Sequence, residues 1–184
     1  DGFQDYTIKK NLSIICFNQN QMIGNGMVLP SGPLRESIHS LKRANIILIN
    51  GEKNIKFENK ILEINKNLEF FYSTYKPINL EEFKNKQLLA IAGIGNPENF
   101  FNLIENNDLR IDEKIIFPDH YKISKTEMQK ILKKAEVKNY QIIMTEKDFF
   151  KIEKYKLKKI KYLKILLEIN EREKFLKRIN DLYD

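Results

Sequence analysis

Residues 29–36 (LPSGPLRE) end in two charged side chains suited to phosphate chemistry. The planar guanidinium of Arg35 binds phosphate or carboxylate through two parallel hydrogen bonds, which a lysine ammonium cannot do. Glu36 beside it is suited to coordinating Mg²⁺ or to orienting Arg35. The glycines and prolines of the segment fix an unusual backbone, and such loops usually carry function. A helix-entry turn with a solvated charge pair is an equal alternative for the segment taken alone.

Asp119 and His120 directly follow Pro118 at the end of a predicted strand. A histidine in this position, preceded by an aspartate, is suited to carrying a proton near pH 7. The other histidine, His39, falls within a predicted helix and is incidental. A lone histidine is more often structural, so this pair alone does not establish a site.

Residues 145–148 (TEKD) follow the next predicted strand. Thr145 as N-cap, with acids in the first turn, predicts an ordinary helix start, and a position for Lys147 near phosphate is the less favoured interpretation. Residues 92–97 (AGIGNP) contain half of a dinucleotide-binding fingerprint. Glu98 leaves the GxGxxG pattern incomplete, so a tight structural turn is favoured.

The elements that would position these side chains alternate between strand and helix, which predicts an α/β architecture. Residues 51–67 give no clear pattern. Strands are expected at residues 12–17, 46–49, 68–75, 88–94, 114–117, 141–144 and 162–167. Helices are expected at residues 36–43, from 97 onward, at 124–134 with a capping box of Ser124 and Glu127, and at 171–182 with Phe175, Leu176, Ile179 and Leu182 on one face.

The 184 residues are 42% apolar and 11% aromatic, which is enough for a packed core in one large or two small domains. The single cysteine, Cys16, lies in an apolar run, so we expect a buried structural thiol in a reducing compartment. No apolar run approaches the ~20 residues that span a bilayer. No signal peptide is visible either.

The net charge of +7 invites a nucleic-acid or anionic-membrane interpretation. Lysine supplies most of the 32 cations, and they are spread along the chain. There is no basic run with interleaved aromatics, which a protein that stacks single-stranded nucleic acid would need. A solvated, lysine-rich surface is therefore favoured, and no nucleic-acid partner is expected.

Taken in order, the segments DGFQ, GNG, LPSGPLRE, a strand ending in NG, AIAGIGNPENFF, FPDHY and MTEKD resemble the tetraacyldisaccharide 4'-kinase family. The resemblance runs from residue 1 to about residue 151, and LPSGPLRE and AIAGIGNP are its specific motifs. It implies a partial P-loop NTPase-type core, here residues 1–75. A smaller C-terminal α/β subdomain follows, here residues 76–184, and in the family ATP and substrate lie in the cleft between the two.

The resemblance also implies the reaction. The family transfers the γ-phosphate of ATP to the 4'-hydroxyl of a tetraacylated glucosamine disaccharide 1-phosphate, a step of lipid A synthesis. The expected cofactors are ATP and Mg²⁺. The expected partners are the lipid A disaccharide precursor and, through peripheral contact, the inner membrane, at the cytoplasmic face of which the enzyme of Gram-negative bacteria works.

Four residues are assigned to nucleotide and metal by the resemblance. Asp1 matches the second acid of a Walker-B-like DDGFQ motif near Mg²⁺, and Gln4 of the same motif faces the site. Arg35 and Glu36 match a pair that lies near the phosphates and the metal. Arg35 is therefore expected in catalysis and in ATP binding, and Glu36 as a metal ligand.

The proton-handling residues are assigned in the same way. His120, with Asp119, matches the histidine that assists removal of the proton from the acceptor hydroxyl, and Lys147 is expected near phosphate. Two positions depart from the family pattern, because Asp5 and Tyr121 stand where the family often has histidine.

The family's P-loop, the first acid of DDGFQ, the aspartate that partners the catalytic histidine and a membrane-binding helix would all lie upstream of residue 1. Phosphoryl transfer depends on positioning the phosphates and neutralising their charge. We therefore expect the chain alone to be nearly inactive. The alternative is a non-catalytic truncated remnant that acts at most as a binding module, and a basic nucleic-acid-binding domain is a third, less favoured interpretation.

Overall fold

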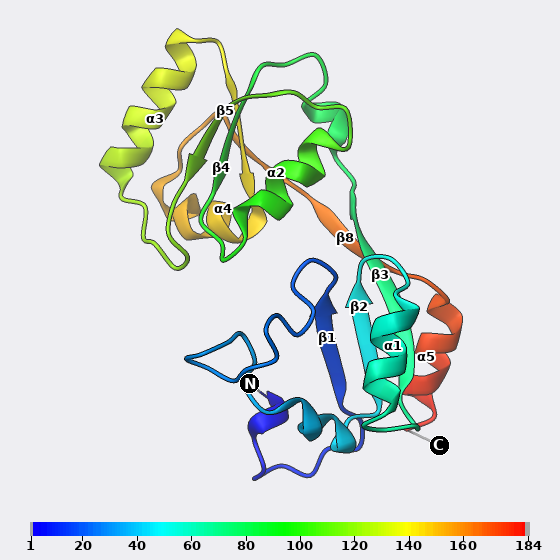
Figure 1. Cartoon of the computed structure of the whole chain (residues 1–184). Helices are drawn as coiled ribbons and strands as arrows, with labels where there is room; N and C mark the ends of the chain where they lie inside the picture. The colour runs from blue at the N-terminus through cyan, green and yellow to red at the C-terminus, as the bar shows by residue number, and fades with distance from the viewer. Residues whose placement is uncertain (1, 183–184) are drawn as a thin grey trace. The chain divides into compact units, whose positions relative to one another are not determined.

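The computed structural model describes residues 2–182, which form two compact units (Figure 1). Within the described residues, the first unit combines residues 2–75 with residues 167–182, and the second comprises residues 76–166. The chain thus enters the second unit at the predicted boundary, but its last residues return to the first unit. Every helix within residues 2–182 is too short or too polar to cross a membrane.

The first unit is built on a sheet with the strand order β1-β2-β3-β8, in which β1, β2 and β3 are parallel. The mixed α/β architecture is as predicted. The elements of this unit are η1 (Gly2–Gln4), β1 (Ile14–Asn18), η2 (Ile38–Arg43), β2 (Ile46–Asn50), α1 (Ile55–Leu62), β3 (Glu69–Pro77), β8 (Ile165–Ile169) and α5 (Arg172–Asn180).

The core of the first unit lies on both faces of β2, whose residues 46–49 are all buried. Because side chains alternate along a strand, Ile47 and Ile49 pack with η2 and α1 on one face. On the other face the rings of Phe71 in β3 and Phe175 in α5 meet edge to face, with centroids 5.1 Å apart. Helix α5 therefore completes the fold of the first unit.

Several local features of the first unit differ from what the sequence predicted. The expected helix at 36–43 is a 3₁₀ helix that begins only at Ile38, and the unassigned residues 51–67 contain α1. Leu176 does not belong to the buried stripe of α5: its exposed fraction is 37%, against 7% for Phe175. Cys16 is exposed, since β1 is an edge strand, and partial desolvation raises the pKa of its thiol.

The second unit is built on a fully parallel sheet with the strand order β5-β4-β6-β7. The strand expected at 162–167 is in fact two strands, β7 here and β8 in the other sheet. The elements of this unit are η3 (Leu80–Glu82), β4 (Leu88–Ala92), α2 (Pro97–Glu105), β5 (Ile111–Ile116), α3 (Lys125–Val137), β6 (Gln141–Thr145), α4 (Glu146–Ile152), η4 (Glu153–Tyr155) and β7 (Ile160–Leu163).

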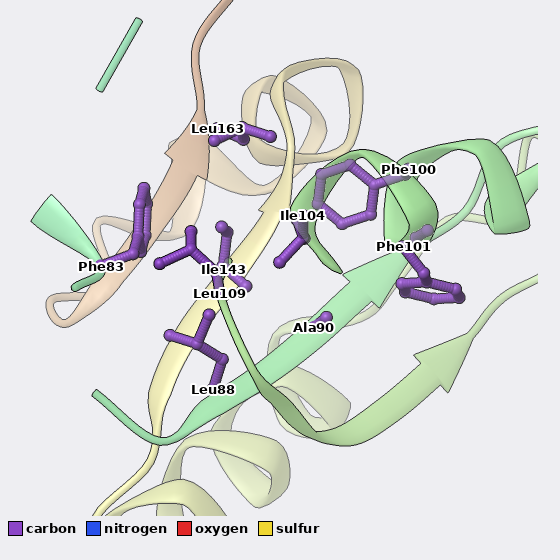
Figure 2. Close-up of a cluster of buried hydrophobic side chains, with 10 residues drawn as sticks. Phe83, Leu88, Ala90, Phe100, Phe101, Ile104, Leu109, Ile143 and Leu163 are labelled. Carbon is purple, nitrogen blue, oxygen red and sulfur yellow. The ribbon is translucent and has the colours of Figure 1, made fainter. Parts of the chain in front are cut away.

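Helices cover both faces of this sheet, which explains why β4 reads as a continuous apolar run. On the α2 face, Leu88 and Ala90 pack with Phe101 and Ile104 (Figure 2). The opposite face packs against α3 and α4. The predicted capping box of α3 is confirmed: Ser124 Oγ accepts a hydrogen bond from the Glu127 N–H, and the Glu127 carboxylate accepts one from the Ser124 N–H.

Strand β4 is the point at which the strand order reverses, because β5 lies on one side of it and β6 on the other. Open α/β sheets bind their ligands at the carboxyl ends of the strands at such a switch point. The loop at residues 93–96 and the start of α4 both lie there, directly after β4 and β6.

Candidate active site

The candidate residues fall into two clusters, one in each unit. In the first unit, a cavity of about 910 Å³ lies beside β1. Gln4, Arg35 and Glu36 all line this cavity, together with Lys10. Asp1, the expected metal ligand, lies outside the described residues. The structure therefore brings together three of the four residues assigned to nucleotide and metal.

Glu36 is held by an arginine that the sequence analysis did not single out. Nη2 of Arg43 lies 2.7 Å from Oε1 and 2.6 Å from Oε2 of Glu36. This hydrogen bond, more than any other cause, lowers the pKa of Glu36, and the side chain of Gln4 adds to it. The carboxylate is thus ionised at neutral pH and fixed at the wall of the cavity.

Arg43 is itself fixed by aromatic rings. Its guanidinium carbon lies 3.9 Å from the ring centroid of Phe3 and 4.9 Å from that of Tyr6. Its Nη2 also donates to the carbonyl of Phe3 at 3.3 Å. Arg43 therefore ties the DGFQ segment to Glu36, and a signal for it was present in the sequence, where arginine is rare.

Gln4 carries an unmatched polar atom. Its Oε1 is buried and accepts no hydrogen bond within the described part of the chain. Buried side-chain oxygens are normally paired, so this acceptor indicates a donor from water or from a ligand in the cavity. Gln4 thus lines the cavity, and its role at a nucleotide site stays a prediction.

The donor set of the first unit bears on whether Mg²⁺ fits. No group of three or more His, Cys, Asp and Glu side chains in residues 2–182 is placed to hold a metal ion. Mg²⁺ is often bound by only one or two carboxylates, with phosphate oxygens and waters completing its shell. Glu36 fits this role as a single carboxylate at the cavity wall, provided that it exchanges part of its pairing with Arg43.

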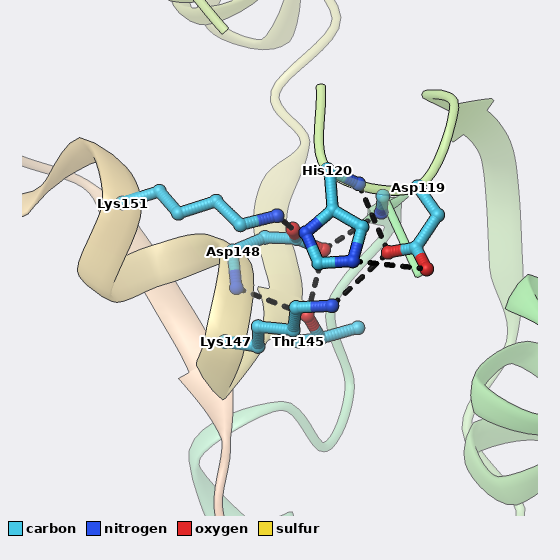
Figure 3. Close-up of polar contacts among 7 residues, drawn as sticks. Asp119, His120, Thr145, Lys147, Asp148 and Lys151 are labelled. Atoms are coloured by element: carbon cyan, nitrogen blue, oxygen red, sulfur yellow. Dashed lines mark hydrogen bonds and ion pairs between the residues drawn. The ribbon is translucent and has the colours of Figure 1, made fainter. Parts of the chain in front are cut away.

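The second cluster lies at the carboxyl ends of β4, β5 and β6 in the second unit (Figure 3). Asp119 is its centre. Lys147 Nζ lies 3.0 Å from Asp119 Oδ1, and His120 Nε2 lies 3.6 Å from Asp119 Oδ2. The hydrogen bond from Lys147 is the main reason that the pKa of Asp119 is lowered. The structure thus brings together all three residues that were predicted for this part of the chain.

His120 has a left-handed backbone, with φ of 61°. This conformation is uncommon outside glycine, although histidine and aspartate tolerate it better than most residues. It is stabilised by the His120 N–H, which donates to Asp119 Oδ1 at 2.9 Å, and by the turn in which Tyr121 N–H donates to the Pro118 carbonyl at 3.1 Å. The imidazole is 81% exposed and is therefore accessible from solvent.

Asp148, one residue beyond Lys147, is a buried carboxylate with only 1% of its side chain exposed. Oδ2 accepts hydrogen bonds from Gly93 N–H and Thr145 Oγ1, both at 2.7 Å. Lys151 Nζ lies 2.7 Å from Oδ1. Thr145 also caps α4 as predicted. Asp148 therefore joins the end of β4 to the start of α4, whereas the sequence predicted it only as an acid in the first turn of a helix.

The glycines of residues 93–95 leave room for these carboxylates. A Cβ atom on Gly93 would lie 3.1 Å from Asp148 Oδ1, closer than ordinary contact, and one on Gly95 would lie 3.5 Å from Asp119 Oδ2. The tight structural turn favoured for this segment is thus present, and it shapes the cluster. Asn96 does not cap α2 with its side chain.

Sequence comparison supplies relatives for the whole chain. The family described as "LpxK: Tetraacyldisaccharide-1-P 4'-kinase" matches residues 1–184. The tetraacyldisaccharide 4'-kinase of Pelagibacter ubique is 40% identical over 182 residues, which cover 97% of this chain and 58% of that protein. The Haemophilus influenzae protein of the same name is 30% identical over 184 residues, 100% of this chain and 53% of its own length. The chain spans about half the length of the curated relatives it matches.

A solved structure shares the fold. It is described as the "apo" form of LpxK from Aquifex aeolicus in complex with ATP, and it covers 100% of this chain and 56% of its own chain with a TM-score of 0.68. At 20% sequence identity, this similarity establishes the fold and not the chemistry. The family match spans both side-chain clusters, from Gln4 to Lys147, and this chain accordingly belongs to the tetraacyldisaccharide-1-P 4'-kinase family.

Proposed function

We propose that this chain forms part of a lipid A 4'-kinase. The whole enzyme transfers the γ-phosphate of ATP to the 4'-hydroxyl of tetraacyldisaccharide 1-phosphate. The observation that carries this proposal is that the family match covers the entire chain, including the residues of both polar clusters. The ATP complex of the structural neighbour supports ATP as the phosphate donor.

The first-unit cavity would hold the nucleotide phosphates. Arg35 and Lys10 line it and supply positive charge, and Gln4 Oε1 offers an acceptor to a ligand hydroxyl or to water. Glu36 is the described residue that would hold Mg²⁺, and the metal would neutralise phosphate charge. Arg43 lowers the pKa of Glu36 and holds its carboxylate at the cavity wall.

His120 is proposed as the proton acceptor. A sugar hydroxyl is a poor nucleophile until its proton is drawn away, and an exposed imidazole near the strand ends can accept it. The hydroxyl oxygen then forms the new bond to the γ-phosphorus, while ADP leaves with the electrons of the broken P–O bond. Asp119 holds the backbone of His120 in place during this step.

The proposed setting is the cytoplasmic face of the inner membrane, because the tetraacylated substrate resides in a bilayer. The lipid A disaccharide precursor is the proposed partner, and contact with the membrane would be peripheral. Purified full-length kinase should phosphorylate the disaccharide 1-phosphate in detergent micelles only when ATP is present. The absence of product with either substrate omitted is the control, and the absence of product with both present would refute the proposal.

We expect the 184 residues alone to have no measurable 4'-kinase activity and to bind Mg·ATP weakly. The sequence contains no GxxxxGK[ST] segment to cradle the nucleotide phosphates. The measurement is transfer of radiolabelled phosphate from ATP to the disaccharide, with isothermal titration of the chain against Mg·ATP. The full-length kinase serves as the positive control. Labelled product from the isolated chain would contradict the expectation, and a full-length protein without activity would favour a binding module.

In the full-length kinase, Arg35→Lys should lower kcat/KM by about 10²-fold, because one ammonium cannot replace two parallel guanidinium hydrogen bonds to phosphate. The melting temperature should stay unchanged, since Arg35 is exposed. Arg110→Lys is the matched control: Arg110 is 86% exposed and pairs with Asp112, and a lysine can keep that pair. Near-normal turnover of the Arg35→Lys enzyme would indicate a structural role for Arg35.

A further inference from the structure

Lys147 does not present a free ammonium in this structure. It is the second residue of α4, and its Nζ lies 3.0 Å from Asp119 Oδ1 with 47% of its side chain exposed. A lysine paired with a carboxylate carries little net charge toward a phosphate, because the two opposite charges largely cancel at a distance. This geometry argues against the expected role of Lys147 in binding phosphate.

The position of Lys147 is set by its neighbour in sequence. Asp148 fixes the first turn of α4 to the end of β4 through Gly93 N–H and to the end of β6 through Thr145. Because successive residues of a helix point in different directions, Asp148 lies buried while Lys147 reaches out toward Asp119 (Figure 3). The ammonium is thus held by a rigid support.

Asp119 connects Lys147 to His120. Its Oδ1 accepts a hydrogen bond from the Lys147 ammonium and a second one from the His120 N–H at 2.9 Å. The other oxygen, Oδ2, lies 3.6 Å from His120 Nε2. The contacts therefore run in series from α4 through Lys147 and Asp119 to the left-handed backbone and the ring of His120.

We propose that Lys147 is a positioning residue: it holds Asp119 in the conformation that orients His120, and it does not bind the nucleotide. The contact itself is independent of any reaction, whereas its catalytic consequence rests on the kinase function proposed above. The charged and titratable groups that face Asp119 are Lys147 from α4 and His120 from its own loop. The loop after β4 contributes Gly95, which has neither charge nor side chain.

The first experiment uses the 184-residue chain and requires no kinase activity. The backbone amide of His120 donates to Asp119, so its ¹⁵N chemical shift follows the titration of that carboxylate. In Lys147→Met we expect the pKa of Asp119 to rise toward the ordinary value of a free aspartate. The substitution removes the ammonium whose hydrogen bond is the main cause of the lowered pKa. Lys147→Arg should keep the pKa low. The matched control is Lys133→Met, which removes one exposed lysine from α3.

The titration experiment can also overturn the proposal. If Lys147→Met and Lys133→Met leave the Asp119 titration equally unchanged, the contact does not exist in solution and the proposal is overturned. The ¹⁵N chemical shift of the His120 amide at pH 7 provides a second check, because Asp119 is ionised there in both Lys147→Met and Lys133→Met. Loss of the contact between Lys147 and Asp119 should change this shift in Lys147→Met only.

The second experiment measures kcat and KM of the full-length kinase. For a positioning residue, Lys147→Met should lower kcat about tenfold and change the KM for ATP less than about twofold, since a misplaced catalytic group mainly slows the chemical step. Lys147→Arg should recover most of kcat. A raised KM for ATP with unchanged kcat would instead assign Lys147 to the nucleotide. If the wild-type kinase is inactive, the proposed function fails while the titration arm still tests the contact.

Discussion

The His120→Ala variant of the full-length kinase is expected to lose about 10²- to 10⁴-fold in kcat, the usual effect of removing a general acid–base group. The acceptor is a sugar hydroxyl, which needs a base as it attacks phosphorus. His120 is the exposed imidazole at the carboxyl edge of the second sheet, and Asp119 holds its backbone. The measurement is steady-state turnover at saturating ATP and disaccharide, together with the melting temperature of the same protein.

Two further variants distinguish the role of the His120 imidazole from that of the backbone conformation at position 120. Asparagine tolerates the left-handed conformation found at position 120, so His120→Asn removes the proton acceptor without straining the turn. It should be as slow as the alanine variant. His39→Ala changes the other histidine, which lies exposed on η2, and should leave kcat unchanged. A destabilised His120→Ala protein with preserved turnover would remove His120 from the mechanism.

The largest expected effect on stability is at Asp148. Asp148→Ala should lower the free energy of unfolding of the second unit by about 3 kcal/mol, because it leaves the Gly93 N–H without its buried partner and the Lys151 ammonium without its counter-ion. Urea denaturation monitored by circular dichroism measures this loss. Asp148→Asn should lie in between, since an amide oxygen can still accept from Gly93 but carries no charge.

Glu146 provides the matched control for this prediction. It lies in the same first turn of α4 and has the same favourable placement near the positive end of the helix dipole, but it makes none of the buried contacts of Asp148. Glu146→Ala should therefore lose only about 0.5 kcal/mol. Equal losses in Glu146→Ala and Asp148→Ala would mean that the helix dipole, and not the buried contacts, explains the role of Asp148.

The elements best predicted from sequence are those determined by local residues. The apolar runs at residues 88–94 and 141–144 predicted β4, which ends at Ala92, and β6, because strands covered by helices on both faces need apolar side chains at every position. Ser124 and Thr145 predicted the starts of α3 and α4, since a capping side chain acts within one helical turn. Helix α1 was missed because polar residues dominate residues 51–67 and, of the four apolar residues of the helix, only Phe57 and Ile61 are buried.

Contacts between residues that are distant in the sequence could not be predicted from local residue patterns. Glu36 precedes the 3₁₀ helix and Arg43 ends it, so their pairing reflects how the chain bends at Ser37 and not a helical spacing. The tie between Asp148 and Gly93 joins residues 55 positions apart. The resemblance to a family supplied residues for both clusters, but not Arg43, which holds Glu36, or Asp148, which holds the start of α4.

The path of the chain through the two units has a consequence for its synthesis. Residues 76–166 leave the ribosome as one uninterrupted segment and can fold at once, whereas the first unit begins before them and is finished only after them. Until Phe175 has emerged, the apolar face of β2 and β3 around Phe71 lacks the aromatic ring of α5 that packs against it. Uncovered apolar surface on a nascent chain is prone to aggregate and attracts chaperones. A released chain that ends between residues 166 and 175 is therefore expected to fold its second unit and to leave its first unit dependent on chaperones.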